Sequence, residues 1–226
     1  MSNVIVITGT TKGLGKDIAL SFLAKKSYKV FGIARGDSTI THKRYVHIKA
    51  DIGTKDGIHT IKSVLENQKI DILINNAALF ANRKFIEMSL DEIQNVLNTN
   101  TLGTILMTKV AINNIVENGR IIFINSVAGL EEIENQSIYC ASKYALTAFA
   151  GVIGKELKDK NIQVTSIHPG GLNTTLWNDS NPYPGNDVNL TIKPDEIINL
   201  INFLLNSPST IRYKTLKLFP NNEWHS

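Results

Sequence analysis

The chain has 226 residues, of which 42% are hydrophobic and 19% charged, with a formal net charge of +4 and a single cysteine. These proportions are typical of a globular protein with a buried core and exclude a disordered chain. A lone cysteine cannot form an internal disulfide, and no apolar run approaches the roughly 20 residues of a membrane-spanning helix. Lys and Arg are scattered, without the basic stripe and interleaved aromatics of nucleic-acid binders. With no basic leader at the N-terminus, we expect a cytoplasmic protein that binds neither membrane nor nucleic acid.

A glycine-rich segment follows the first apolar run. Residues 4–7 have the pattern of a strand buried on both faces of a parallel sheet, and apolar residues at helical spacing follow residue 15. Between them, the glycines of residues 8–15 let the backbone approach a phosphate, and the helix N-terminus adds partial positive charge. A P-loop does not fit, because Asp17 follows its Gly-Lys pair and an earlier glycine is missing. Strand, glycine turn and helix therefore predict a phosphate-binding loop, although the glycine spacing differs from the commonest dinucleotide fingerprint.

Two cations bear on the choice of cofactor. Arg35 follows the second apolar run, residues 30–33. At this place in dinucleotide folds, a carboxylate binds the ribose 2′-hydroxyl, whereas an arginine accommodates a 2′-phosphate. Lys12 supplies another cation inside the glycine loop. We therefore predict NADPH or NADP+ as the cofactor, in preference to NADH.

Strand-like and helical patterns alternate along the rest of the chain. Strands are expected at residues 45–49, 71–74, 120–126, 162–167 and 213–219, and helices after the caps Thr54 and Ser89 and at residues 102–116, 139–158 and 194–205. Residues 98–101 are a polar interruption of the kind that marks a distortion or a site. Residues 174–192 are polar and turn-rich and predict a short substrate lid. The alternation predicts a single α/β domain over residues 1–226, a Rossmann-like doubly wound parallel sheet of about seven strands with helices on both faces.

Tyr139 and Lys143 share one face if their segment is helical. An ammonium beside a phenol favours the phenolate, whose unperturbed pKa is about 10, and such a phenol can exchange a proton with a substrate oxygen. Ser126, at the end of an expected strand, could hydrogen-bond the same oxygen. Tyr and Lys at this spacing are common on helix surfaces, so the pair depends on its context. That context is the glycine loop, Arg35 and Ser126, which all fall where strands end and ligands bind.

Together these residues resemble the short-chain dehydrogenase/reductase family, over residues 4–205. The loop at residues 8–15 matches that family's Thr-Gly-x-x-x-Gly-x-Gly cofactor turn, and residues 75–77 match the motif after its fourth strand. The resemblance implies a catalytic tetrad of Asn100, Ser126, Tyr139 and Lys143. It implies cofactor contacts from Gly9, Thr11, Lys12, Gly13, Leu14, Gly15, Arg35, Asp51, Ile52, Asn76, Ala77, Tyr139, Lys143, Pro169, Gly170, Leu172 and Thr174.

The resemblance also implies a mechanism. Tyr139 would be the general acid in the reduction of a small ketone or oxoacyl substrate to an alcohol, or the base in the reverse reaction. Lys143 would hold the nicotinamide ribose and lower the phenol's pKa, while Ser126 would orient and polarise the carbonyl. Asn100 would anchor a water that links Lys143 to solvent. The cofactor would supply the hydride, and the two long helices would suit a homodimer or homotetramer.

Some features depart from the family, and other functions stay open. Ala78 stands where the family usually has glycine, and residues 221–226 lack its glycine-rich ending. A non-catalytic NADP(H)-binding regulator or scaffold of the same fold is the alternative. A nucleotide-sugar epimerase or dehydratase shares the Tyr and Lys but normally has another glycine spacing and a larger C-terminal region. The histidines show no metal-ligand spacing, and we expect His168 to be a loop residue and no metal to bind.

Overall fold

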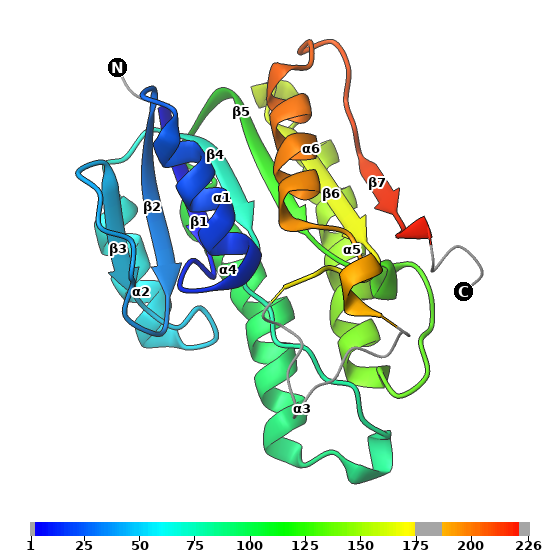
Figure 1. The fold of residues 1–226 in the computed structure, drawn as a ribbon. Coiled ribbons are helices and arrows are strands. Elements are labelled where there is room, and N and C mark those ends of the chain that lie inside the picture. The colour runs from blue at the N-terminus through cyan, green and yellow to red at the C-terminus, as the bar shows by residue number, and fades with distance from the viewer. Residues whose placement is uncertain (1–2, 175–186, 222–226) are drawn as a thin grey trace.

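The computed structural model describes residues 3–174 and 187–221, and its centre is a seven-stranded parallel sheet (Figure 1). The strands lie in the order β3-β2-β1-β4-β5-β6-β7, and every neighbouring pair is parallel. Their bounds are β1 (Asn3–Thr8), β2 (Tyr28–Ala34), β3 (Tyr45–Lys49), β4 (Ile70–Asn75), β5 (Ile115–Ile124), β6 (Gln163–Pro169) and β7 (Thr215–Leu218). The strand order reverses direction between β1 and β4, which is where this class of sheet opens a ligand crevice. The predicted doubly wound sheet is confirmed.

Helices cover both faces of the sheet (Figure 1). They are α1 (Gly13–Ala24), α2 (Lys55–Leu65), α3 (Leu90–Leu97), α4 (Thr104–Ala111), α5 (Ser137–Glu156) and α6 (Pro194–Asn206), with 3₁₀ turns at Phe85–Glu87, Val127–Gly129, Lys158–Lys160 and Val188–Leu190. Because side chains alternate along a strand, Ile72 and Ile74 pack in the core beneath α1 and α6, while Leu73 packs in the core beneath α2, α4 and α5. Burial on both sides explains why the strands read as continuous apolar runs.

Two helix starts follow their local sequence. The hydroxyl of Thr54 accepts a hydrogen bond from the Gly57 amide at 3.1 Å. Ser89 and Glu92 form a reciprocal capping box, in which the Ser89 hydroxyl accepts from the Glu92 amide at 3.1 Å and a Glu92 carboxylate oxygen accepts from the Ser89 amide at 3.0 Å. Both predicted caps are therefore confirmed.

The helix expected at residues 102–116 is wrong in its extent. A π-helical turn occupies Asn98–Gly103, so the distortion predicted at the polar interruption is present, and α4 ends at Ala111. Ile115 already belongs to β5 and pairs with Ile70 of β4, whose amide donates to the Asn114 carbonyl at 2.8 Å. Asn118, with φ 63°, lies inside β5, whose pairing with β4 has a register shift between Ile70 and Ile72. β-branched residues at 115 and 116 and an open place beside β4 override the helical pattern.

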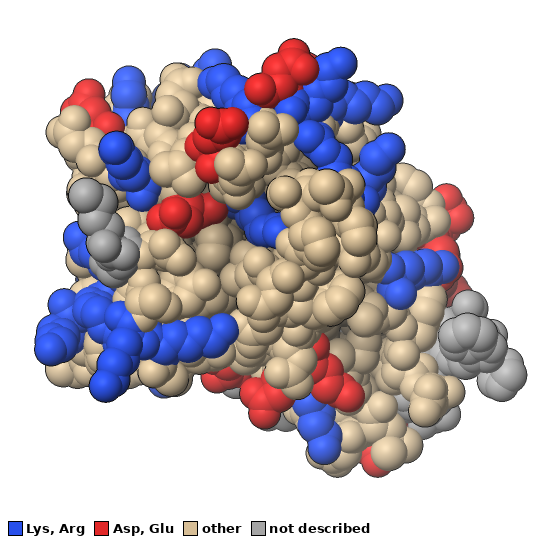
Figure 2. Space-filling view, turned by 90° about the horizontal axis from the view of Figure 1, so that it is seen from above, with Lys and Arg blue, Asp and Glu red and all other residues tan. Residues whose placement is uncertain are grey.

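The amino ends of the strands lie at the top of the view in Figure 1. On the face seen from above, Lys and Arg side chains form separate groups with Asp, Glu and uncharged residues between them (Figure 2). The predicted site residues belong to the opposite edge, at the carboxyl ends of the strands. Among the described residues, no helix combines the length and apolar character that crossing a membrane would require. Residues 175–186 of the predicted lid and 222–226 of the C-terminal segment lie outside the described residues.

Candidate active site

A cavity of about 550 Å³ opens at the carboxyl edge of the sheet. From the predicted cofactor residues it brings together Gly9, Thr11, Lys12, Gly13, Leu14, Gly15, Arg35, Asp51, Ile52, Asn76, Ala77, Tyr139, Lys143, Leu172 and Thr174. Its other lining residues, which the sequence analysis did not assign to the cofactor, are Ala34, Gly36, Ala50, Ala78, Leu79, Phe80, Thr99, Ile124 and Asn125. Most of these flank a predicted residue or a strand end, which is the signal that could have found them. A cavity of this size suits a small molecule or cofactor.

Four predicted residues are not among those lining the cavity. Pro169 ends β6, and the Gly170 amide donates to the Leu218 carbonyl of β7 at 2.8 Å, so this pair joins the two strands. Asn100 is fully buried behind the cavity, and Ser126 is half-buried beside Tyr139. These four positions therefore lie outside the described lining of the cavity.

The glycine loop is shaped for close contact with an anion. Gly9 has φ 78°, which a residue with a side chain rarely adopts. A Cβ on Gly15 would lie 2.2 Å from the Gly9 carbonyl oxygen and 2.4 Å from Nδ2 of Asn76. Among residues 3–174 and 187–221, no side chain caps the N-terminus of α1 at Lys12, and its dipole faces the cavity that Gly13, Leu14 and Gly15 line. This cradle fits the pyrophosphate of a dinucleotide.

Asn76 and Thr8 fasten the loop to the sheet. The Thr8 hydroxyl accepts from the amides of Asn76 and Ala77, both at 2.9 Å, and the Asn76 side chain donates to the Thr8 carbonyl at 2.9 Å. These bonds lock the end of β4 to the end of β1, at the place where the strand order reverses. The cavity floor is therefore held rigidly between these two strands.

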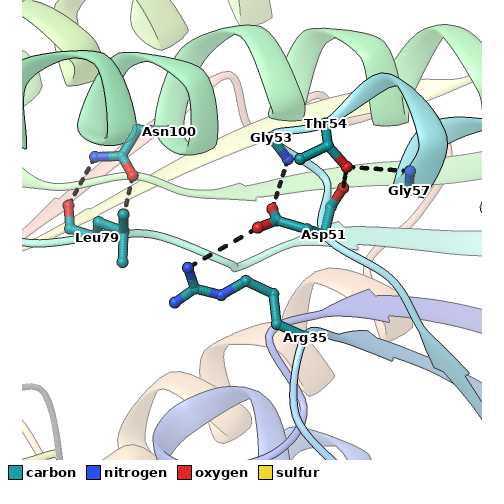
Figure 3. Close-up of polar contacts among 7 residues, drawn as sticks. All are labelled: Arg35, Asp51, Gly53, Thr54, Gly57, Leu79 and Asn100. Atoms are coloured by element: carbon teal, nitrogen blue, oxygen red, sulfur yellow. Dashed lines mark hydrogen bonds and ion pairs between the residues drawn. The ribbon is translucent and has the colours of Figure 1, made fainter. Parts of the chain in front are cut away.

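Arg35 and Asp51 both line the cavity, and the Arg35 side chain points toward Asp51 (Figure 3). Nη1 of Arg35 is 3.9 Å from Oδ2 of Asp51, while Oδ1 of Asp51 accepts from the Gly53 amide at 2.8 Å. An exposed ion pair of this length is worth only about 0–1 kcal/mol. The guanidinium can therefore leave Asp51 for a stronger anionic partner.

Asn100 clamps the loop that follows β4. Its Oδ1 accepts from the Leu79 amide at 2.7 Å, and its Nδ2 donates to the Leu79 carbonyl at 2.8 Å (Figure 3). The same Nδ2 donates to the Ser142 hydroxyl at 3.1 Å, which ties the π-helical turn to α5. Water anchoring by this residue stays a prediction.

Tyr139 and Lys143 are both buried on α5, with 7% and 2% of their surfaces exposed. Nζ of Lys143 lies 5.5 Å from the centre of the Tyr139 ring and donates to the Ile124 carbonyl at 3.3 Å. Burial raises the pKa of Tyr139 to about 12, against a smaller lowering by its hydrogen bond with Ser126. Burial lowers the pKa of Lys143 to about 8. The phenol's pKa therefore moves opposite to the expected direction, because burial outweighs the neighbouring groups.

The expectation that His168 is a loop residue is wrong. It lies in β6 and is fully buried. Its Nδ1 is 2.9 Å from the Ser126 carbonyl oxygen. The strand continues two residues further than expected because His168 and Pro169 pair with Lys217 and Leu218 of β7.

Comparison with known proteins agrees with this arrangement. A family model described as short chain dehydrogenase matches residues 3–184. Carbonyl reductase family member 4 from Xenopus laevis is 30% identical over 223 residues, covering 92% of this chain and 93% of that protein. L-xylulose reductase from Caenorhabditis elegans is 29% identical over 227 residues, covering 92% of this chain and 90% of that protein.

Solved structures share the whole fold. 4-hydroxyisoleucine dehydrogenase complexed with NADH has a TM-score of 0.86 and 24% identity, and the match covers 100% of both chains. A short chain dehydrogenase from Burkholderia cenocepacia J2315 in complex with NADP has a TM-score of 0.81 and 24% identity, with 96% of both chains covered. Similar folds thus hold either nucleotide, and the choice between them depends on this chain's own residues. Since the family model matches most of its length, the chain belongs to the short-chain dehydrogenase family and is an oxidoreductase.

Proposed function

We propose that the protein is an NADPH-dependent carbonyl reductase that interconverts a small or oxoacyl-type ketone and its alcohol. The observation that carries this proposal is the burial of Tyr139 and Lys143 in the wall of the cavity that also holds the uncapped N-terminus of α1. A dinucleotide whose pyrophosphate lies on that helix would reach the Tyr139 side along the carboxyl edge of the sheet. When bound, this cofactor supplies the hydride.

In this mechanism Tyr139 is the proton donor. A pKa of about 12 keeps its phenol protonated at neutral pH, which is the form that a reduction needs. Ser126 hydrogen-bonds Tyr139 and would share the substrate oxygen with it, polarising the carbonyl. In the reverse direction the phenol must first lose its proton, and the Lys143 ammonium would favour that loss once the ribose is held beside it.

Arg35 and Lys12 support NADPH over NADH. Both line the cavity together with Asp51, which would face the adenosine. Within the described part of the chain, Arg35 is held by the long contact to Asp51, so a 2′-phosphate would gain a bidentate charged partner without breaking a strong bond. The predicted preference rests on this geometry.

The surroundings of Tyr139 bear on the substrate. The Phe80 ring packs edge-on against the Tyr139 ring, with centroids 5.0 Å apart at 78°. Ala128 and Ile133 belong to the same apolar cluster. These neighbours suit a carbonyl with an apolar flank. We also propose that the protein acts in the cytoplasm and that it forms a homodimer or homotetramer. Light scattering after size exclusion would test the oligomeric state.

The test begins with fluorescence titrations of NADPH and NADH, followed by a panel of ketones monitored at the nicotinamide absorbance. Replacing Tyr139 by Phe should lower turnover by about 10²- to 10⁴-fold, because the general acid is lost, while the affinity for NADPH changes little. Undiminished turnover in Tyr139→Phe would remove this residue from the mechanism. Tight binding of NADPH without turnover of any ketone would favour the alternative, a non-catalytic binder.

A further inference from the structure

The buried imidazole of His168 contacts Ser126, and the proposed mechanism gives this imidazole no role. Its Nδ1 lies 2.9 Å from the Ser126 carbonyl oxygen. Its Nε2 is buried and has no hydrogen-bond partner among the residues that the structure describes. In the described part of the chain, the polar contact of this side chain is therefore with the main chain of a proposed catalytic residue.

The chemistry of that contact fixes the tautomer. A carbonyl oxygen only accepts hydrogen bonds, so Nδ1 carries the proton and donates it, and Nε2 keeps a lone pair. The pKa of His168 is lowered chiefly by burial, with Lys143 of α5 and Lys217 of β7 adding to the effect against the hydrogen bond to Ser126. The ring is neutral at physiological pH, and its donor points steadily at Ser126.

An unpartnered nitrogen in the interior is costly. A buried polar atom without a partner costs about 1–3 kcal/mol, and a leucine of similar volume at this site would carry no such cost. Such local costs are expected where a residue serves a site and not the core.

Besides its hydrogen bond with Tyr139, Ser126 makes three hydrogen bonds that hold it in place. Its carbonyl accepts from Nδ1 of His168 and from the Gly129 amide at 3.0 Å, and its hydroxyl accepts from the Ala128 amide at 3.1 Å. The Gly129 and Ala128 bonds lie within the same turn and would move with it. His168 is on β6, so its bond ties that turn to the sheet.

We propose that His168 is a positioning residue that holds the Ser126 main chain against β6, and thereby places the Ser126 hydroxyl at the substrate oxygen. This inference rests on the proposed function, because it requires Ser126 to act on the substrate. Without the bond, the turn at Val127–Gly129 would shift together with the hydroxyl. A misplacement of about 1 Å can cost on the order of 10²-fold in rate.

The test compares His168→Leu with His168→Asn in the full chain, using NADPH and the best ketone of the panel. Leucine removes the donor and keeps an apolar volume, whereas the asparagine amide keeps a donor at the δ position. We expect kcat to fall about 10- to 100-fold in His168→Leu and to recover most of that loss in His168→Asn. The Kd for NADPH should stay the same in both variants. The melting temperature should stay the same in His168→Asn, and in His168→Leu it should stay the same or rise. Thr165→Val, at an opposite-face position of β6, should leave turnover unchanged.

The Ser126→Ala background separates the possible outcomes. If His168 acts through Ser126, then adding His168→Leu to Ser126→Ala lowers kcat no further. A full additional loss in the double variant, or unchanged turnover of His168→Leu beside a defective Ser126→Ala, would overturn this inference and leave the proposed function intact. An active Ser126→Ala would instead overturn the role of Ser126 itself. Should His168→Leu not fold, His168→Ala serves in its place, with the same expected loss and the same rescue by asparagine.

Discussion

Arg35 and Asp51 approach each other at the cavity without closing into a tight ion pair. Nη1 and Oδ2 are 3.9 Å apart, and 61% of the Arg35 side chain and 33% of the Asp51 side chain are exposed. A contact so long and so open holds the guanidinium weakly. Arg35 is therefore available for a phosphate, while Asp51 keeps its hydrogen bond from Gly53.

The first prediction concerns cofactor choice. Arg35→Ala should raise the Kd for NADPH about 10- to 100-fold, because a hydrogen-bonded contact to a charged group is worth about 1.5–3 kcal/mol. The Kd for NADH should stay nearly constant. Lys49→Ala is the matched control, since Lys49 pairs with Asp37 at 2.8 Å and is not among the residues lining the cavity. Equal losses for both nucleotides in Arg35→Ala would contradict recognition of a 2′-phosphate by this residue.

The second prediction concerns the Asn100 clamp. Asn100→Ala removes the side-chain bonds to both main-chain groups of Leu79, and we expect the free energy of unfolding to fall by about 2–4 kcal/mol. Urea denaturation of the cofactor-free protein measures the change. Asn98→Ala, an exposed position of the same π-helical turn, should change stability by no more than about 0.5 kcal/mol. Similar effects of the two variants would show that Asn100 is not a clamp.

The third prediction concerns stability between pH 8 and pH 10. The pKa of Lys143 is about 8 in the folded protein, below the 10.5 of an unburied lysine in the unfolded chain. Below pH 8 both states bind the proton. As pH rises above 8 the folded state loses it first, so the unfolded state binds more protons and the free energy of unfolding rises. Above pH 10 the raised pKa of Tyr139 acts in the opposite direction, which limits the window.

Lys143→Met removes this pH dependence. The unfolding free energy of the wild-type protein minus that of the variant should rise by about 2 kcal/mol from pH 8 to pH 10. One pH unit corresponds to at most 1.36 kcal/mol per proton. At pH 7 the variant should be the more stable protein, since no ammonium is buried in it. A difference that stays flat across this range would show that Lys143 titrates normally in the fold.

The fourth prediction concerns the glycine loop. A Cβ at Gly15 would lie 2.2 Å from a main-chain oxygen, so Gly15→Ala must move the loop or α1, and we expect NADPH binding to be lost. Gly151→Ala is the contrasting variant, because a Cβ there meets nothing within 4 Å. It should stabilise α5 by about 1 kcal/mol through helix propensity. Calorimetry of both variants, with and without NADPH, checks the pair, and retained binding by Gly15→Ala would refute the close-packed cradle.

Local patterns in the sequence determined much of this molecule. Apolar runs located the strands, glycines located the phosphate loop, and Ser89 and Thr54 predicted their helix starts, because each of these signals acts over a few neighbouring residues. The resemblance carried by residues 8–15 and 75–77 then indicated the family, and the strand-end rule placed most of the cofactor residues on one edge.

Contacts distant in sequence decided the rest. β5 begins at Ile115 because β4 offers it hydrogen bonds, and no helical period reports on that neighbour. The pKa of Tyr139 rises because packing removes water from it, which outweighs the local effect expected from Lys143. The hydrogen bonds between Asn100 and Leu79 and between His168 and Ser126 join segments that are distant in sequence and that the fold brings together. Sequence alone indicated most of the predicted groups that line the cavity, whereas the tertiary structure decided their solvation and their partners, since both depend on atoms that lie far apart along the chain.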